Sequence, residues 1–241
     1  MTILQKTAIV TGGGKRVGAA IVTALVADGW RVMAHVHRDA DPVPDGAVKV
    51  VADLAAADCA ETIFAAVDGP VGLLVNNAAR FEYDGFGAAS AAEFDAHMAV
   101  NAGAPMLLID ALARRHAAGD MALVVNILDA KLAAPNPDYL SYSLSKYAAA
   151  GLTELAARAL AGRGIRVNAI APALLLPSGP QDEAAFARVH TLNPLARGVS
   201  VDDVTAALHF LIDQPAMTGQ TLVIDGGQRF MALPRDVQFL E

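Results

Sequence analysis

Residues 11–18 read TGGGKRVG, and this stretch decides the predicted fold. The apolar run KTAIV precedes it, and AAIVTALVADG, which carries apolar residues at helical spacing, follows it. A strand, a glycine-rich turn and a helix in that order are typical of a site that binds the pyrophosphate of a dinucleotide. One position departs from the usual TGxxxGxG pattern, because Arg16 stands where a glycine is expected. The stretch therefore predicts a phosphate-binding turn with an unusual cation in it.

The rest of the chain alternates between short β-rich runs and longer segments with apolar residues at helical spacing. Runs that are apolar on both faces indicate a buried parallel sheet, and the segments between them supply its helical crossovers. The predicted fold is a single α/β domain over residues 1–241, a doubly wound seven-stranded parallel sheet with helices on both faces. The seven predicted strands are residues 7–11, 31–36, 47–51, 72–77, 122–128, 165–171 and 221–226.

Composition and charge narrow the classes of function. The chain is 54% hydrophobic and carries a formal net charge of −7, which argues against a nucleic-acid partner and against a polybasic membrane surface. A single cysteine, Cys59, makes no intrachain disulfide, which favours a reducing compartment. The sequence shows no secretory leader and no apolar run of about 18 residues. We expect a cytoplasmic protein with no membrane partner, and we predict no metal site.

A second group of residues indicates catalysis. Tyr142 and Lys146 are four residues apart in a predicted helix, so their side chains share one helical face. A nearby ammonium group stabilises a phenolate and lowers the pKa of the phenol, which makes the tyrosine a usable acid. A YxxxK match alone is weak, but this one follows the fifth predicted strand and lies about 130 residues after the phosphate turn.

Two segments fall outside the regular alternation. Residues 172–194 contain four prolines after the sixth strand, which favours a lid or substrate loop, with an irregular surface loop as the alternative. Residues 228–241 extend past the last strand as a tail. This tail could close an active site in the same or a neighbouring subunit, and Arg229 is its candidate contact.

Taken together, these motifs resemble the short-chain dehydrogenase/reductase family, a Rossmann-like fold, over essentially the whole chain. The matching pieces are TGGGKRVG, VADL at 51–54, NNAA at 76–79, Asn101, Tyr142 with Lys146, VNAIAP at 167–172 and TGQTLVIDGG at 218–227. The resemblance implies that Tyr142 donates the proton, that Lys146 holds the nicotinamide ribose and lowers the Tyr142 pKa, and that Asn101 supports a relay water. It assigns the following residues to the cofactor: Gly12, Lys15, Arg16, Val17, Gly18, His37, Arg38, Asp53, Leu54, Asn77, Ala78, Ala79, Lys146, Pro172 and Leu174.

One departure from the family pattern concerns the reaction. The usual catalytic serine falls thirteen residues before the tyrosine, and that position here is Asp129. A carboxylate accepts hydrogen bonds from amino and ring N–H groups, and a protonated carboxyl group can donate to a ring nitrogen. Asp129 therefore hints at reduction of a C=N bond in an amino-substituted heterocycle. The alternative is that Asp129 only caps the turn that follows it.

Arg16 and Asp129, together with HVHR at 35–38, resemble the pteridine reductase branch of the family. This branch includes the short-chain type of dihydrofolate and dihydromonapterin reductases. The resemblance implies NADPH, because Lys15, His37 and Arg38 offer cations for a 2′-phosphate, although the carboxylate of Asp39 would oppose it. It also implies that Phe81 stacks on the heterocycle, with an ordinary core position as the alternative. Ala79 and Leu175 replace polar residues of the branch and leave the exact substrate open.

The prediction from sequence is thus an NADPH-dependent oxidoreductase that reduces the C=N bond of a pterin-like or dihydropterin substrate by hydride transfer, with the proton from Tyr142 or Asp129. The residues assigned to catalysis are Asp129, Tyr142, Lys146 and Asn101, and those assigned to the substrate are Arg16, Phe81, Asp129 and Tyr142. One alternative is an NADP-dependent carbonyl (ketone) reductase, and another is a member acting on a different amino-heterocycle. A third is a nonenzymatic NADP-sensing module that binds a partner protein. Two Ala-rich helical segments, residues 91–119 and 141–162, favour a homo-oligomer, and the family resemblance implies a tetramer.

Overall fold

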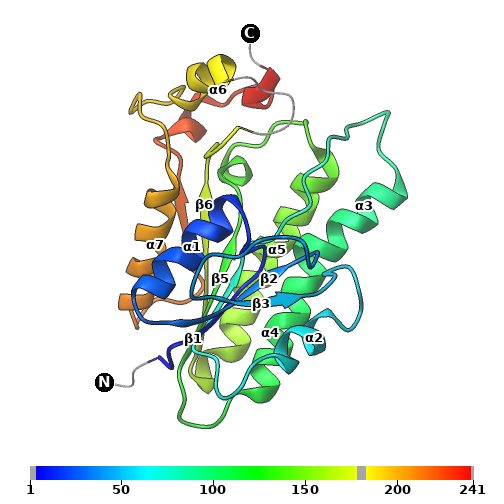
Figure 1. The fold of residues 1–241 in the computed structure, drawn as a ribbon. Coiled ribbons are helices and arrows are strands. Elements are labelled where there is room, and N and C mark those ends of the chain that lie inside the picture. Colours follow the sequence, from blue (N-terminus) through cyan, green and yellow to red (C-terminus); the bar gives the residue numbers. More distant parts are fainter. Residues whose placement is uncertain (1–3, 178–182, 240–241) are drawn as a thin grey trace.

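The strands form one parallel sheet in a computed structural model that describes residues 4–177 and 183–239. Its order is β3-β2-β1-β4-β5-β6-β7, so the direction of strand progression reverses between β1 and β4 (Figure 1). In such sheets the ligand binds at the carboxyl ends of the strands beside this switch point. The strands are β1 (Thr7–Val10), β2 (Arg31–Val36), β3 (Val48–Val51), β4 (Leu73–Asn76), β5 (Ala122–Ile127), β6 (Ile165–Pro172) and β7 (Thr221–Ile224). All seven predicted strands and the single-domain fold are confirmed.

Helices cover both faces of the sheet because successive strand side chains point in opposite directions. On one face Val10 packs in a cluster with Ile21 of helix α1 and Leu208 of α7. On the other face Ile9 packs in a cluster with residues of α2, α4 and α5. The helices are α1 (Arg16–Ala27), α2 (Cys59–Ala65), α3 (Ala91–Met98), α4 (Ala104–Arg115), α5 (Leu140–Leu160), α6 (Glu183–His190) and α7 (Val201–Asp213).

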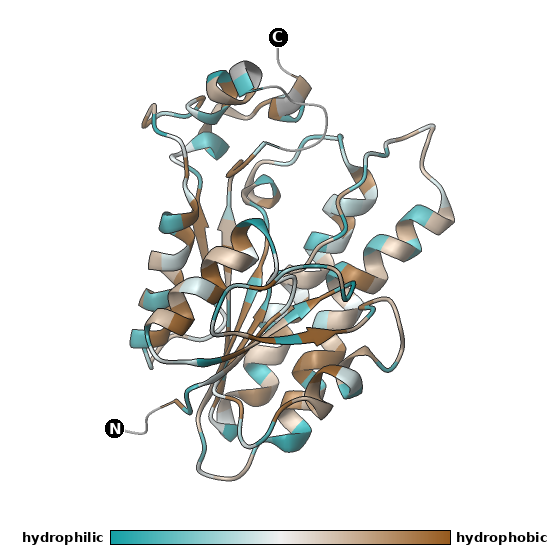
Figure 2. Cartoon of the chain, viewed as in Figure 1, coloured by the Kyte–Doolittle hydropathy of each residue, from teal (hydrophilic) through white to brown (hydrophobic). Residues whose placement is uncertain are grey.

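The distribution of apolar residues matches this layering. Every residue of the central strands β4, β5 and β6 is buried, and brown, hydrophobic segments recur along the visible part of the sheet in Figure 2. Burial of about 25 cal/mol per Å² of apolar surface supplies the main stabilisation of such a core. The period-two pattern is weak in these strands because both faces are covered, as expected for a parallel sheet.

A long apolar helical stretch runs from α3 through a π-helical turn, η1 (Ala99–Gly103), into α4. By length and composition alone this stretch, Ala91–Arg115, could cross a membrane, with a mean hydropathy of 1.2. More than half of that apolar window, 56%, is buried inside the protein, where α4 packs in the core cluster. Its hydropathy is therefore accounted for by its place in the core.

The two irregular segments meet above the carboxyl ends of the strands. Part of the predicted substrate loop forms α6, and the tail forms two short 3-10 helices, η4 (Gln228–Met231) and η5 (Val237–Phe239). Helix α6 and η5 lie in contact with each other at this end of the molecule (Figure 1). Residues 178–182 of the predicted loop lie outside the described residues. Two further 3-10 turns, η2 (Ala130–Ala133) and η3 (Ala161–Arg163), flank α5.

Candidate active site

A cavity of about 960 Å³ lies along the carboxyl ends of the strands. Within the part of the chain that the structure describes, Arg38 and Asn101 are the predicted site residues that do not line it. The other predicted residues are brought together in its wall: Gly12, Lys15, Arg16, Val17, Gly18, His37, Asp53, Leu54, Asn77, Ala78, Ala79, Phe81, Asp129, Tyr142, Lys146, Pro172 and Leu174.

The glycine-rich turn depends on glycine for two physical reasons. Gly12 has φ +64°, a left-handed conformation that residues with a side chain rarely adopt. A Cβ at Gly18 would lie 2.0 Å from the carbonyl oxygen of Gly12, so the helix can approach the turn only without a side chain there. Asn77 holds the turn from β4, because its Nδ2 donates to the Thr11 carbonyl oxygen at 2.9 Å. These contacts shape a cradle that fits a dinucleotide pyrophosphate.

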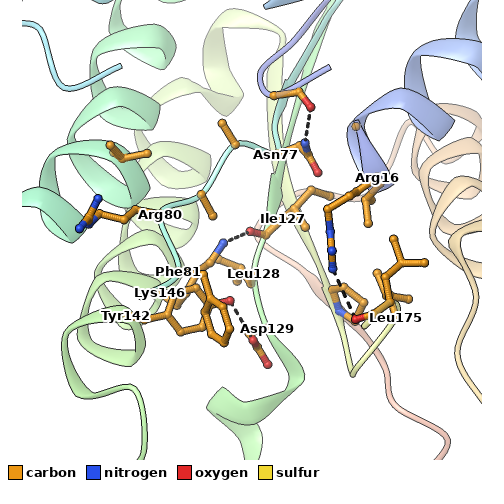
Figure 3. A pocket seen from close by; sticks show the side chains of 18 of the residues that line it. Arg16, Asn77, Arg80, Phe81, Ile127, Leu128, Asp129, Tyr142, Lys146 and Leu175 are labelled. Atoms are coloured by element: carbon orange, nitrogen blue, oxygen red, sulfur yellow. Dashed lines mark hydrogen bonds between the residues drawn. The ribbon is translucent and has the colours of Figure 1, made fainter. Parts of the chain in front are cut away.

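Arg16 has the left-handed backbone conformation that usually requires a glycine at this position of the turn. Its φ is +53°, which costs a non-glycine residue roughly 1–2 kcal/mol. Its guanidinium donates to the carbonyl oxygen of Pro177 at 2.8 Å and to that of Leu176 at 3.4 Å. Arg16 therefore ties the phosphate turn to the start of the predicted substrate loop, a contact that the sequence did not indicate (Figure 3).

The two histidines of HVHR lie in different surroundings, because β2 ends at Val36, between them. His35 is buried, and its Nδ1 accepts from the Gly12 N–H at 3.2 Å, so the proton is on Nε2, which lies 3.0 Å from the Ala52 carbonyl oxygen. Burial lowers the pKa of His35, in keeping with this neutral role. His37 lines the cavity, and its Nδ1 lies 3.9 Å from Asp53 Oδ1.

In the loop after β2, the charged residues that face the cavity differ from those predicted to lie beside the 2′-phosphate. The Arg38 backbone N–H donates to Asp41 Oδ2 at 3.1 Å, and Asp41 lines the cavity. Asp39, the carboxylate expected to oppose a 2′-phosphate, is not among the lining residues of the described chain. Asp41 is therefore the acidic residue of this loop that faces the cavity, and sequence reasoning missed it.

Asp129 and Tyr142 form the centre of the site (Figure 3). The Tyr142 hydroxyl donates to Asp129 Oδ2 at 2.8 Å, and Asp129 Oδ1 accepts from the Lys131 backbone N–H at 2.8 Å. One carboxylate oxygen of Asp129 caps η2 while the other contacts the phenol, so Asp129 does more than cap the turn. Its role toward a heterocycle stays a prediction. Lys146 Nζ donates to the Ile127 carbonyl oxygen at 2.7 Å and lies 5.6 Å from the centre of the Tyr142 ring.

The electrostatics of Tyr142 correct one expectation. Burial, together with the charge and hydrogen bond of Asp129, raises the pKa of Tyr142 well above its ordinary value. Burial also lowers the pKa of Lys146 to about 8. The expected lowering of the Tyr142 pKa is therefore wrong in this structure, because the phenol is buried and its hydroxyl is hydrogen-bonded directly to the Asp129 carboxylate. The phenol keeps its proton at neutral pH and acts as a donor.

Asn101 lies in the π-helical turn, behind the cavity wall. Its Oδ1 accepts from the Arg80 N–H at 2.8 Å, and its Nδ2 donates to the Arg80 carbonyl oxygen and to Ser145 Oγ. These contacts fix the loop after β4 against α5. A role for Asn101 in a proton relay stays a prediction.

Phe81 stands in the cavity wall with 36% of its surface exposed. Its ring stacks on Tyr139 with centroids 4.2 Å apart and meets Tyr142 edge-on at 4.7 Å. The core alternative for Phe81 therefore does not describe its surroundings. A ring held in this way offers an apolar face beside the proton donor.

Several residues of the cavity wall, most of them in the tail, were not assigned to the site from the sequence. Arg229 lines the cavity as suggested, with its Nη1 2.9 Å from Asp225 Oδ1. The missed residues in the wall include Glu82, Lys131, Leu233, Arg235, Asp236 and Val237. The one signal was that Lys131 follows Asp129 by two residues, but nothing local places the tail beside it.

A doubly wound parallel sheet, a glycine-rich turn at its switch point and a tyrosine–lysine pair in one cavity define the class of nucleotide-dependent oxidoreductases. A family model described as enoyl-(acyl carrier protein) reductase matches residues 14–229. The chain therefore belongs to the short-chain dehydrogenase/reductase family.

Three similar proteins differ in their activities. FolM alternative dihydrofolate reductase 1 from Brucella suis, solved in complex with NADP, is 34% identical with a TM-score of 0.85, covering 93% of this chain and 95% of its own. Pteridine reductase 1 of Leishmania tarentolae is 31% identical, over 91% of this chain and 95% of the relative. L-xylulose reductase of Bos taurus is 33% identical, over 94% and 98% respectively. The family relationship alone thus leaves both heterocycle and carbonyl substrates open.

Proposed function

We propose that this protein is an NADPH-dependent reductase of a pterin-like or dihydropterin C=N bond. The observation that carries the proposal is the 2.8 Å hydrogen bond between Tyr142 and Asp129 in the wall of the cavity. A carboxylate at this place can accept from the amino and ring N–H groups of such a heterocycle. The pteridine reductase and FolM relatives support the same substrate class.

The residues present fit a nicotinamide dinucleotide. The glycine cradle would hold the pyrophosphate, and Lys15 and His37, both in the wall, would face the adenosine 2′-phosphate. Lys146 would hold the nicotinamide ribose, and the backbone from Pro172 to Leu174 would flank the nicotinamide. When bound, NADPH would supply the hydride. The NADP complex of the Brucella relative supports this cofactor.

Side chains of the protein would supply the proton and stabilise the charge that its transfer leaves behind. Tyr142 keeps its proton at neutral pH and would give it to the nitrogen of the reduced bond. The ammonium of Lys146, 5.6 Å from the ring centre, would offset the negative charge that develops on the phenol oxygen. Asp129 would orient the heterocycle and the phenol together. Phe81 would stack on the flat face of the substrate.

The test is NADPH consumption with dihydropterins, dihydrofolate, oxidised pterins and simple ketones, repeated with NADH. Turnover of pterins with NADPH, and none of ketones, supports the proposal. The second candidate is an NADP-dependent carbonyl reductase, which the L-xylulose reductase relative favours. Ketone turnover with inert pterins would establish it instead. No turnover of any substrate, with tight NADPH binding, would favour the sensing module.

We also infer a cytoplasmic homo-oligomer, with a tetramer as the expected state. The buried free thiol of Cys59 suits a reducing compartment. Helices α4 and α5 expose Met106, Leu144, Tyr147 and Leu155, which offer apolar surface to a second copy. Analytical ultracentrifugation measures the state directly, and a monomer at micromolar concentration would contradict the inference.

A further inference from the structure

The C-terminal segment forms one wall of the cavity in the same subunit. Leu233, Arg235, Asp236 and Val237 line it together with Lys131, which follows the catalytic carboxylate Asp129. The wall is therefore built by two segments about a hundred residues apart in the chain.

Asp138 anchors this wall. Its buried carboxylate accepts from Arg235 Nε at 2.8 and 3.1 Å and from the Asp236 backbone N–H at 2.8 Å. Burial alone raises the pKa of Asp138, but the bonds from Arg235 and Asp236 outweigh it and keep the pKa below its usual value. The anchor is therefore ionised at neutral pH. The guanidinium of Arg235 also lies over the Phe239 ring, 4.9 Å from its centre.

The anchor places a second charged pair beside the reacting groups. Asp236 Oδ2 lies 3.5 Å from Lys131 Nζ, and the two side chains are only 15% and 9% exposed. The ammonium of Lys131 also donates to the Asp138 carbonyl oxygen. The charge of Asp236 contributes to the raised pKa of Tyr142, which is consistent with its closeness to the phenol. Both members of the pair face the same cavity as Asp129.

The charges at this end of the cavity define the substrate that fits. Asp129, Asp236 and Glu82 present carboxylates, and Lys131 presents an ammonium. Three arginines also line this wall, and each is ion-paired with a carboxylate outside the lining: Arg80 with Glu93, Arg229 with Asp225 and Arg235 with Asp138. A neutral substituent that both donates and accepts hydrogen bonds, such as a hydroxyl group, satisfies the Lys131–Asp236 pair. Because the arginines are already paired, an anionic substituent meets the ammonium of Lys131 but also three like charges, at a local dielectric well below that of water.

We propose that Asp236 and Lys131 are specificity-determining residues, which accept a neutral hydroxylated substituent of the heterocycle and reject an anionic one. This proposal rests on the proposed function of the same cavity. The tail would act in its own subunit, with Asp138 as a positioning residue.

The test compares a neutral and an anionic substrate of one class, dihydrobiopterin and dihydrofolate. For Asp236→Asn we expect the ratio of kcat/KM for dihydrofolate to that for dihydrobiopterin to rise about tenfold. Lys131→Met should shift the same ratio the opposite way. Asp138→Asn should raise the KM for both substrates while the NADPH dissociation constant stays unchanged. Asp213→Asn is the matched control, because that exposed carboxylate at the end of α7 lies outside the cavity.

The outcomes separate this proposal from the proposed function. If the wild type reduces ketones and not pterins, the proposed function fails, and the same ratio is then measured with a neutral ketone and a keto acid. An unchanged ratio in both Asp236→Asn and Lys131→Met, with NADPH binding intact, overturns the proposal. If Asp236→Asn fails to bind NADPH, the Lys131→Met ratio decides.

Discussion

Tyr142 donates a hydrogen bond to one carboxylate oxygen of Asp129, while the other oxygen of Asp129 caps the 3-10 turn that begins beside it. The capping bond fixes the orientation of the carboxylate, so the phenol has a preorganised acceptor. A serine in the same place could form one such bond through its hydroxyl but would add no charge. This relationship supports the proposed heterocycle substrate over a simple carbonyl compound.

The first prediction concerns that carboxylate. Asp129→Ser should lower kcat/KM for a pterin by about 100-fold, because hydrogen bonds to a charged group contribute roughly 1.5–3 kcal/mol. Serine keeps a capping oxygen, so the melting temperature should change little. Steady-state kinetics with thermal unfolding checks both expectations. Unchanged pterin turnover would show that the carboxyl group has no role in the reaction.

The Arg16 backbone gives the second prediction. Arg16→Gly and Arg16→Ala both remove the guanidinium bonds to the substrate loop, but only glycine relieves the φ of +53°. The glycine variant should exceed the alanine variant in free energy of unfolding by about 1 kcal/mol. Urea denaturation of the pair measures this difference. Equal stabilities would mean that the turn relaxes when the guanidinium is absent.

Lys146 gives a prediction about pH. Burial lowers its pKa from 10.5 in the unfolded chain to about 8 in the folded protein. Between these pH values the unfolded state binds more protons than the folded state, so the free energy of unfolding rises with pH. Below pH 8 Lys146 is protonated in both states, and the full destabilisation caused by burying its charge is present. From pH 7 to 10.5 the wild type should gain about 3 kcal/mol of unfolding free energy relative to Lys146→Met.

Denaturation of both proteins at several pH values checks this linkage. The Lys146→Met protein also lacks the bond to the Ile127 carbonyl oxygen, but that loss is a constant offset and leaves the slope unaffected. A difference that does not vary with pH would show that Lys146 titrates normally in the folded state.

The fourth prediction concerns cofactor choice. Lys15 and His37 line the cavity and Arg38 does not, so Lys15→Ala should raise the KM for NADPH by about tenfold, as expected for loss of a charge-assisted phosphate contact. Arg38→Ala should have a much smaller effect. Asp41→Asn should lower the KM for NADPH, because a carboxylate in the wall opposes the phosphate. The KM for NADH, measured in parallel, should stay constant in all three variants. A larger effect of Arg38→Ala would contradict this arrangement.

The order of elements was readable from the sequence because it depends on local patterns. Apolar runs such as residues 122–128 and the turn around Gly12 and Gly18 report backbone conformation within a few residues. Tyr142 and Lys146 were placed on one helical face by spacing alone, and the structure has both on α5. The buried role of His35 was not readable, since a histidine that ends a strand looks the same whether it faces the core or the solvent.

The sequence by itself determined the fold class and the phosphate turn, because periodicity and glycine geometry are local properties of the chain. Most of the site residues predicted from it also lie in the cavity wall. The tertiary structure alone decided which hydrogen bonds and ion pairs those residues form. Arg16 reaches a carbonyl 161 positions away, and Arg235 pairs with Asp138 across 97 positions. It also reversed the expected direction of the Tyr142 pKa shift, because the phenol is buried and hydrogen-bonded to the carboxylate of Asp129. Such contacts depend on loop paths and side-chain directions, which no short pattern encodes.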